Sequence, residues 1–393
     1  MKILAFSANP VTWTRERAIG GAEIRYVSIL SRWYKKGIEI TAVEYESSAS
    51  KRLCVEYPVH IIRIPKRIPL IVKFVVWIAG CIKFIVLNKK ENFSLIYAPT
   101  NNVSDLIPSI LAKIILKRPL VICVQNANPV YSFMRVLNLY GGRFFNRLLL
   151  TVGNLFSLAI ERHGDLIIAI SQVTKNTLVQ LGLDESKIVV NGMGVEERLI
   201  EKFEQPLKKE YDAVFIGRVE KEKGIFDLLQ AWKIVAEKRP TVKLLVIGDG
   251  SELEHAKRFV EENNISKNVI FTGSIYSEEK YDLLKKSKVM VYPTFSREGF
   301  CLSILDALSC GLPVITYNEY FTIDVYKKCK AVIFLKMKDI YSLIKTLSNF
   351  IELNETELNK YSKYAYNFIK DKTWSEVAKL ELEYIINKIL KCE

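Results

Sequence analysis

Histidine is rare in this sequence, and cysteine never occurs in a closely spaced pair. The 393 residues include three histidines, and no two cysteines form a Cys-x-x-Cys motif. The seven cysteines stand singly at positions 54, 81, 123, 301, 310, 329 and 392. A disulfide framework and a zinc site are therefore not expected, and the cysteine usage predicts a protein of the reducing cytoplasm.

Neither a secretory signal nor a membrane-spanning run is evident. The start, MKILAFSANP, lacks a sustained apolar run and is followed by Trp13. The most apolar segment, 69–87, is interrupted by Lys73 and Lys83, and its longest uncharged stretch has nine residues, too few to cross a bilayer. At helical spacing Lys73, Gly80 and Lys83 fall toward one side of the segment and leave a broad apolar face. Two interpretations stay open. The segment is a core helix of an α/β domain, or it docks on an anionic membrane surface without crossing it.

Acidic residues are outnumbered by basic ones. The 57 lysines and arginines against 43 aspartates and glutamates give a formal net charge of +14. Such an excess suits a solvated lysine-rich surface, or attraction to nucleic acid, acidic lipid or a phosphorylated substrate. No helix-turn-helix or RNP-like pattern and no long basic run occurs, so no nucleic acid partner is expected. Basic residues do flank the apolar segment, at Arg63, Lys66 and Arg67, and 141–164 is a second basic and apolar stretch.

The composition predicts a folded chain of two domains. Hydrophobic residues make up 49% and charged residues 25% of the sequence, and the length suits two domains of about 150–200 residues. Short apolar strands alternate with segments of helical periodicity. The expected strands are MKILAFSA, IEITAVEY, SLIYAP, PLVICVQ and DLIIAIS, then YDAVFIG, VKLLVIG, NVIFTG, KVMVYPT and PVITY. This alternation predicts an α/β fold of two Rossmann-like, doubly wound domains facing a central cleft.

The domain boundary is expected in a charged segment. Residues 197–211, ERLIEKFEQPLKKEY, are polar and contain one proline, as linkers often do. We therefore predict an N-terminal domain in 1–200 and a C-terminal domain in 208–373. The chain ends in helical patterns, the last of which lies in 374–393.

The stretch SREGFCLSILDALSCGLPV carries two acids. Glu298 is expected in a loop after a strand, and Gly299, Phe300 and Cys301 at the start of the following helix, where free backbone N–H groups suit a phosphate. Asp306 lies further along this otherwise apolar helix, where an unpaired acid is costly. Either Asp306 pairs locally and Glu298 is an ordinary helix-terminal charge, or both acids contact a polyhydroxyl ligand.

Two other segments combine glycine with a helix start. GRVEKEKG places Arg218 and Lys223 after the first strand of the second half, where two cations can hold a diphosphate or can be ordinary loop charges. In RAIGGAEIRY, the pair Gly20–Gly21 precedes a helix and allows close approach to a phosphate or sugar, or is a plain turn. VIGDGSELE lacks the third glycine of a dinucleotide fingerprint, so Gly248 and Gly250 are interpreted as turn and helix-start residues.

These motifs together carry a family resemblance. EGFCLSILDALSCGLPVI resembles the signature of the retaining GT4 family of GT-B glycosyltransferases, and GRVEKEKG is similar to its arginine–lysine segment. FTGSIYSEEKYDLLKKSKVMVYPT, GGAE, DLIIAIS and GMGVE resemble further family segments. WSEVAKLELEYI resembles the final helix, which in the family returns to the first domain. The resemblance covers nearly the whole chain and is most specific in 211–318.

The resemblance implies an enzyme and the residues that act in it. It implies a hexosyltransferase that moves a sugar from a UDP- or GDP-sugar, bound by the C-terminal domain, to an acceptor bound by the N-terminal domain, with retention of configuration. Arg218 and Lys223 would hold the donor diphosphate, and Glu298 would contact the donor sugar near its reacting side. Gly21 would approach the phosphates from the first domain.

Further donor contacts follow from the same resemblance. The amides of Gly299, Phe300 and Cys301 would face the sugar and phosphate. Asp306 would bind the ribose diol, although the family usually has glutamate there, and the shorter side chain implies a weaker or water-mediated contact. Ile275 would lie near the base. No Asp-x-Asp motif is placed to hold a metal, and GT-B enzymes generally need none, so no cofactor is expected.

The acceptor side is less defined. The family often has a histidine after the strand PLVICVQ, where this chain has Gln125 and Asn126, so no general base is assigned. Many family members act on lipid-linked acceptors, which favours a lipid-linked glycan or glycolipid precursor and a peripheral position on the inner face of the cell membrane. The alternatives are a small soluble acceptor, a GT-B sugar-nucleotide epimerase, and an inactive GT-B scaffold.

Overall fold

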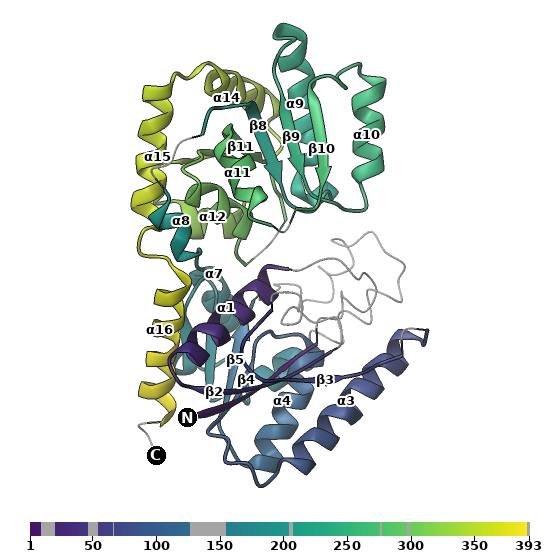
Figure 1. Cartoon of the computed structure of the whole chain (residues 1–393), viewed down its shortest axis with the longest axis vertical. Coiled ribbons are helices and arrows are strands. Elements are labelled where there is room, and N and C mark those ends of the chain that lie inside the picture. Colours follow the sequence, from purple (N-terminus) through teal and green to yellow (C-terminus); the bar gives the residue numbers. More distant parts are fainter. Residues whose placement is uncertain are drawn as a thin grey trace. The chain divides into compact units, whose positions relative to one another are not determined.

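The computed structural model describes residues 1–8, 20–45, 54–65, 67–125, 155–203, 207–275, 277–296 and 299–390 (Figure 1). The chain divides into two compact units. Unit 1 comprises Met1–Met193 and Trp374–Glu393, and unit 2 comprises Gly194–Thr373. Each unit contains a parallel β-sheet, so the predicted α/β architecture of two doubly wound sheets is confirmed.

The sheet of unit 1 has seven strands among the described residues, in the order β3-β2-β1-β4-β5-β6-β7. They are β1 Lys2–Ser7, β2 Glu39–Tyr45, β3 Val59–Ile62, β4 Leu95–Ala98, β5 Leu120–Val124, β6 Leu166–Ala169 and β7 Ile188–Val190. β4, β5 and β6 are buried at every position, as expected for central strands of a parallel sheet. The sequence did not predict β3 and β7, because these edge strands have only four and three residues.

Unit 1 also contains α-helices among its described residues. They are α1 Gly21–Lys35, α3 Leu70–Leu87, α4 Val103–Leu116, α7 Gln172–Gln180, and α16 Trp374–Ile385, which continues into the π-helical Ile386–Leu390. Asp105 in the first turn of α4 accepts hydrogen bonds from the Ala8 amide at 2.8 Å and from the Thr100 hydroxyl at 2.6 Å. These bonds fix the end of β1 beside the start of α4, at the carboxyl edge of the sheet.

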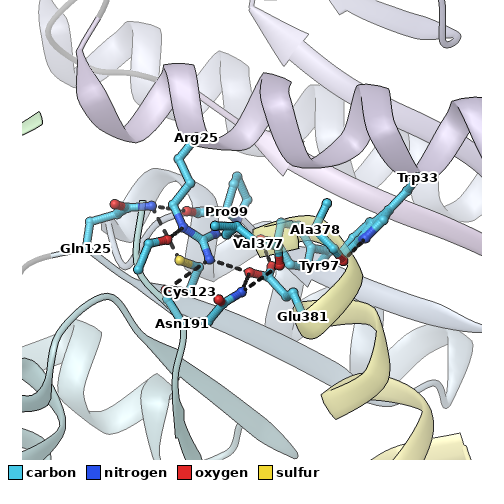
Figure 2. A network of polar contacts seen from close by, with 11 residues as sticks. Arg25, Trp33, Tyr97, Pro99, Cys123, Gln125, Asn191, Val377, Ala378 and Glu381 are labelled. Atoms are coloured by element: carbon cyan, nitrogen blue, oxygen red, sulfur yellow. Dashed lines mark hydrogen bonds and ion pairs between the residues drawn. The ribbon is translucent and has the colours of Figure 1, made fainter. Parts of the chain in front are cut away.

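The last helix, α16, packs on α1 within unit 1 (Figure 1). The indole of the fully buried Trp33 donates to the Ala378 carbonyl oxygen at 2.8 Å. Arg25 and Glu381, both fully buried, form an ion pair that is surrounded by polar groups (Figure 2). Tyr97 donates its hydroxyl hydrogen to Glu381 Oε1 at 2.6 Å, and Asn191 Nδ2 donates to Glu381 Oε2 at 2.9 Å. Because a buried carboxylate needs such partners, this network fixes α16 in unit 1.

The sheet of unit 2 has six strands among the described residues, in the order β10-β9-β8-β11-β12-β13. They are β8 Tyr211–Ile216, β9 Leu244–Ile247, β10 Val269–Gly273, β11 Ser287–Tyr292, β12 Val314–Tyr317 and β13 Val332–Leu335. The five strands predicted for the second half are present, and β13 at the sheet edge was missed. Each strand runs parallel to its neighbours, so all the loops that follow the strands emerge at one edge.

Unit 2 also contains eight described α-helices. They are α8 Glu197–Glu201, α9 Ile225–Lys238, α10 Leu253–Glu262, α11 Glu279–Lys285, α12 Leu302–Ser309, α13 Tyr320–Tyr326, α14 Ile340–Glu352 and α15 Glu355–Ile369. Segment 197–211, the expected linker, thus begins with the helix α8, and the division between the units falls after Met193. Across the described part of the chain, every helix is too short or too polar to cross a membrane.

Candidate functional site

The strand order of unit 2 contains a switch point. β8 and β11 are neighbours, yet the chain runs from β8 outward to β9 and β10 on one side, and from β11 outward to β12 and β13 on the other. The loops after β8 and β11 therefore lead away from each other at the carboxyl edge, and in doubly wound sheets ligands bind at this place. The predicted site residues Arg218 and Lys223 follow β8, and Gly299, Phe300 and Cys301 follow β11.

Hydrogen bonds join these two loops. The Glu222 carbonyl oxygen accepts from the Phe295 amide at 3.0 Å and from the Thr294 hydroxyl at 3.1 Å. Gly224 has φ +76°, and a Cβ atom there would lie 2.0 Å from the Pro293 carbonyl oxygen. Only glycine combines this backbone conformation with so close an approach. The start of α9 is thus fixed against the segment that leads to Gly299.

The two cations of the first loop differ in exposure. Arg218 directly follows Gly217 and is exposed. Lys223 is the last residue of the 3-10 helix Lys221–Lys223 and is only 1% exposed. A buried ammonium group must be compensated by polar or anionic groups, so Lys223 is part of the packed structure of the loop. The interpretation as an ordinary solvated loop charge is therefore wrong for Lys223 and remains compatible with Arg218.

The second loop leads into α12. Gly299 and Phe300 precede the helix, and Cys301 is its N-cap residue, so the helix begins at Leu302, later than the sequence suggested. Tyr326 contacts this segment: the Cys301 carbonyl oxygen accepts from the Tyr326 hydroxyl at 2.7 Å, and the centroids of the Phe300 and Tyr326 rings are 5.8 Å apart. Glu298 lies outside the described residues.

Asp306 forms an ion pair that the sequence did not reveal. Its Oδ2 atom accepts a hydrogen bond from Lys280 Nζ at 2.8 Å. Lys280 is the second residue of α11, and the two side chains are 16% and 14% exposed. Nothing in the spacing pointed to Lys280, because the two residues are 26 positions apart and meet only where α11 packs on α12. Asp306 is therefore paired locally, as one of the two interpretations expected, and its contact with a polyhydroxyl ligand stays a prediction.

The remaining predicted donor residue of unit 2 lies past β10. Ile275 is half-buried, two positions after Gly273. The loop after β9 is tightly packed against the loop after β8, since a Cβ at Gly248 would lie 1.9 Å from the Gly217 carbonyl oxygen. A Cβ at Gly250 would lie 2.3 Å from the Val219 carbonyl oxygen. These glycines thus serve the packing between loops, in line with their interpretation as turn residues.

Unit 1 contains the predicted site residue Gly21, and also Gln125, which stands where the family often has histidine. Gly21 is the first residue of α1, and the amide of its N-cap neighbour Gly20 donates to Glu23 Oε2 at 2.8 Å. Gln125 follows β5, and its Nε2 donates to the Pro99 carbonyl oxygen at 3.2 Å (Figure 2). Asn126 lies outside the described residues.

The apolar segment forms α3, and its two faces differ. Trp77, Cys81 and Ile85 are fully buried in the core of unit 1. Lys73 is only 8% exposed, so it does not belong to a surface that could contact lipid, contrary to the grouping suggested by helical spacing. The opposite face is exposed and mainly apolar; its large members are Ile71, Val72, Val75, Ile82, Val86 and Leu87. The core interpretation therefore holds for the inner side of α3, and docking of the outer side on a membrane stays a prediction.

No candidate metal site emerges from the described ranges. There the structure brings together no group of three or more His, Cys, Asp or Glu side chains that could hold a metal ion. The independence from metal that the sequence suggested stays a prediction.

Comparison with known protein families gives two adjoining matches. The family model "Glycosyltransferase Family 4" matches residues 19–198, and "Glycosyl transferases group 1" matches residues 197–368. An uncharacterised glycosyltransferase of Methanocaldococcus jannaschii is 25% identical over 307 residues, which is 74% of this chain and 74% of that protein. The capsular polysaccharide biosynthesis glycosyltransferase CapM of Staphylococcus aureus is 28% identical over 242 residues, 57% of this chain and 62% of CapM.

Solved structures share the fold. Anabaena HepE in complex with UDP and glucose matches with a TM-score of 0.74 at 18% identity, over 98% of this chain and 99% of HepE. Sucrose-phosphate synthase of Thermosynechococcus elongatus matches with the same TM-score at 17% identity, over the full length of both chains. The two matched models cover the switch-point loops and every described strand except β1, and the chain therefore belongs to the GT4 family of glycosyltransferases with the GT-B fold, enzymes that use nucleotide-sugar donors.

Proposed function

We propose that this glycosyltransferase transfers a sugar from a UDP- or GDP-sugar, with retention of configuration, to a lipid-linked glycan or glycolipid precursor. One observation carries the donor part of the proposal. The hydrogen bonds of the Glu222 carbonyl oxygen join the loop of Arg218 and the buried Lys223 to the segment that leads to Gly299. HepE, which shares the fold, has been solved with UDP and with UDP-glucose, and this supports a nucleotide site in such a sheet.

In this proposal unit 2 binds the donor. Arg218 and Lys223 hold the diphosphate, and the backbone of Gly299, Phe300 and Cys301 faces sugar and phosphate at the start of α12. Positive charge and helix-terminal amides stabilise the negative charge that grows on the leaving diphosphate. Glu298 contacts the donor sugar beside the reacting carbon, and Ile275 lies near the base. Removing one such contact reduces rates by a factor on the order of 10²–10³.

The acceptor proton has a simple route in this mechanism. Gln125, at the position where the family often has histidine, carries an amide that does not titrate. The bond between the sugar and the diphosphate breaks, the acceptor oxygen bonds to the sugar carbon on the same face, and the departing diphosphate oxygen takes the acceptor's proton. Unit 1 binds the acceptor.

The acceptor class is proposed from the surface of α3. Its exposed apolar face includes Ile71 at 74%, Val75 at 60% and Leu87 at 72% exposure, and the exposed Arg63 and Lys83 are nearby in sequence. An apolar face with basic neighbours suits docking on an anionic membrane surface, which is where a lipid-linked acceptor is found. The relative CapM, named for capsular polysaccharide biosynthesis, supports a precursor of a surface polysaccharide.

The test first measures the thermal unfolding of the protein with each member of a panel of nucleotide sugars, and then the binding of a nucleoside diphosphate to a variant. True donors are expected to raise the unfolding temperature, because a ligand that binds only the native state stabilises it. Arg218→Ala should then weaken binding of the matching nucleoside diphosphate by about 1–3 kcal/mol in calorimetry, the scale of a charge-assisted hydrogen bond. Arg258→Ala, an exposed arginine of α10, is the matched control and should bind normally. Unchanged affinity of the Arg218 variant would contradict the diphosphate assignment.

A further inference from the structure

The ion pair of Lys280 and Asp306 lies at the carboxyl edge of the unit 2 sheet. Lys280 belongs to the first turn of α11, which begins soon after β10, and Asp306 belongs to α12, which begins soon after β11. The distance between Lys280 Nζ and Asp306 Oδ2 is 2.8 Å. Each side chain is mostly buried, yet about one seventh of its surface stays accessible, at 16% and 14%. The pair is thus shielded by protein and still reachable from outside.

Lys280 is held as a cation from two sides. Burial alone lowers the pKa of Lys280, but the charge of Asp306 and the neighbouring Tyr281 outweigh burial and raise the pKa above the ordinary lysine value. The Lys280 ammonium also lies 4.4 Å from the centroid of the Tyr281 ring. A desolvated cation over an aromatic face is favourable, so the ammonium group is fixed in place and charged at neutral pH.

The pair leaves one carboxylate oxygen for a ligand. Asp306 Oδ2 accepts from Lys280, whereas no hydrogen bond to Asp306 Oδ1 occurs in the described part of the chain. A carboxylate oxygen accepts hydrogen bonds, and an ammonium group has three N–H donors. Acceptor and donor therefore stand side by side, and this arrangement matches two neighbouring hydroxyls, one of which donates while the oxygen of the other accepts.

We propose that Lys280 is a nucleotide-binding residue that fixes the Asp306 carboxylate and donates to one hydroxyl of the donor ribose, while Asp306 Oδ1 accepts from the other. This inference rests on the proposed nucleotide-sugar function. It also explains how the short side chain of aspartate suffices where the family usually has glutamate. Lys280 shares the diol, so Asp306 need not bridge both hydroxyls.

The test compares ribose with dideoxyribose. Calorimetry would measure the Kd of UDP and GDP, each beside its 2′,3′-dideoxy form, for the wild type and for Lys280→Met, which keeps the length of the side chain without its charge. We expect the variant to raise the Kd of the ribonucleotide about tenfold and to leave the Kd of the dideoxy form nearly unchanged. Lys280→Arg should recover part of the loss. An equal loss for both sugars, or no loss, would overturn the proposal.

Controls separate this inference from the function on which it rests. Lys286→Met removes a lysine six positions further on, whose Nζ lies 3.1 Å from Glu210 Oε1 in a more exposed ion pair, and should bind both sugars normally. Thermal unfolding without nucleotide checks that each variant is folded. If Arg218→Ala weakens nucleotide binding and Lys280→Met does not, only the role of Lys280 fails. If the wild type binds neither UDP nor GDP, the donor site fails and this inference with it.

Discussion

Glu161 is a buried carboxyl group of unit 1 with one unsatisfied oxygen. Its Oε1 accepts from Asn101 Nδ2 at 3.1 Å, and within the described part of the chain its Oε2 has no hydrogen-bond partner. Burial raises the pKa of Glu161 to about 7, although the bond from Asn101 opposes the shift. The ordinary glutamate pKa is about 4.3. Between these values the folded chain binds more protons than the unfolded chain at this group, so the free energy of unfolding falls as pH rises.

Glu161→Gln should therefore change the pH dependence of stability. Near pH 5 the native carboxyl group is protonated and resembles the amide, so variant and wild type should have similar free energies of unfolding. At pH 8 the variant should be more stable by about 1–3 kcal/mol, because it avoids a buried charge with an unsatisfied oxygen. Urea unfolding at both pH values measures this. The exposed Glu185→Gln is the control, and a Glu161 variant less stable than wild type at pH 8 would contradict the argument.

Gly224 offers a second prediction for a single residue. Alanine at Gly224 combines φ +76° with a Cβ only 2.0 Å from the Pro293 carbonyl oxygen, whereas Gly37 has φ +80° and open space around its Cβ position. Gly37→Ala should lower the free energy of unfolding by about 1 kcal/mol through the backbone conformation alone. Gly224→Ala should lower the free energy of unfolding further. It should also weaken nucleotide binding, because the loop of Lys223 must shift. Urea unfolding and calorimetry compare the two, and equal losses with normal binding would show that the contact is unimportant.

At the scale of elements, α3 is exposed on one side and part of the core on the other. Trp77 on the inner side donates its indole N–H to the Ser104 carbonyl oxygen at 2.8 Å, which fixes the helix against α4. The outer side keeps large apolar side chains exposed. Contiguous exposed apolar surface on a helix marks a site of interaction. The core and membrane interpretations of the segment are therefore compatible.

Replacing Ile71, Val75 and Val86 by serine should reduce sedimentation with vesicles that contain phosphatidylserine or cardiolipin. Serine removes apolar burial in the lipid interface, worth about 25 cal/mol per Å², and leaves the inner face intact. The control is Ile114→Ser on α4, which removes another side chain that is 65% exposed. High salt should also release the wild type, because each nearby basic residue contributes about 1 kcal/mol through screened attraction. Equal sedimentation with neutral vesicles would remove the electrostatic part, and none at all would favour a soluble acceptor.

At the scale of the whole molecule, the two ends of the chain belong to one unit. Unit 2 is inserted between Met193 and Trp374, and α16 is held in unit 1 by Glu381. Breaking a buried ion pair from one side destabilises by about 3–5 kcal/mol, because it leaves the other charge uncompensated. The stability of unit 1 thus depends on the last helix of the sequence.

Calorimetry of unfolding should separate the units. Glu381→Ala leaves Arg25 without its carboxylate partner and should lower the unfolding temperature of unit 1. Glu383 is exposed on the same helix, and Glu383→Ala should have little effect. The nucleoside diphosphate should raise the unfolding temperature of unit 2 in both variants, since the proposed diphosphate residues lie there. A uniform shift of a single transition by Glu381→Ala would contradict this expectation and would show that the two units unfold together.

The sequence by itself determined the secondary structure of the central strands and the edge of the sheet at which the candidate site residues lie. Runs such as LVICV and LIIA are apolar at every position because parallel strands are buried on both faces, and the alternation with helices implied doubly wound sheets. It also placed Arg218, Lys223 and the segment from Gly299 to Cys301 after strands, hence at one edge. Short edge strands such as β3 gave no comparable signal.

Only the tertiary structure decided which distant residues meet. Local periodicity reports which side of an element is buried, but it contains no information on the partner that packs there. The pairing of Lys280 with Asp306, and of Arg25 with Glu381, depends on the packing of α11 on α12 and of α1 on α16. For the same reason the buried position of Lys73, in a helix whose spacing grouped it with Lys83, became evident only from the packing of α3 in unit 1.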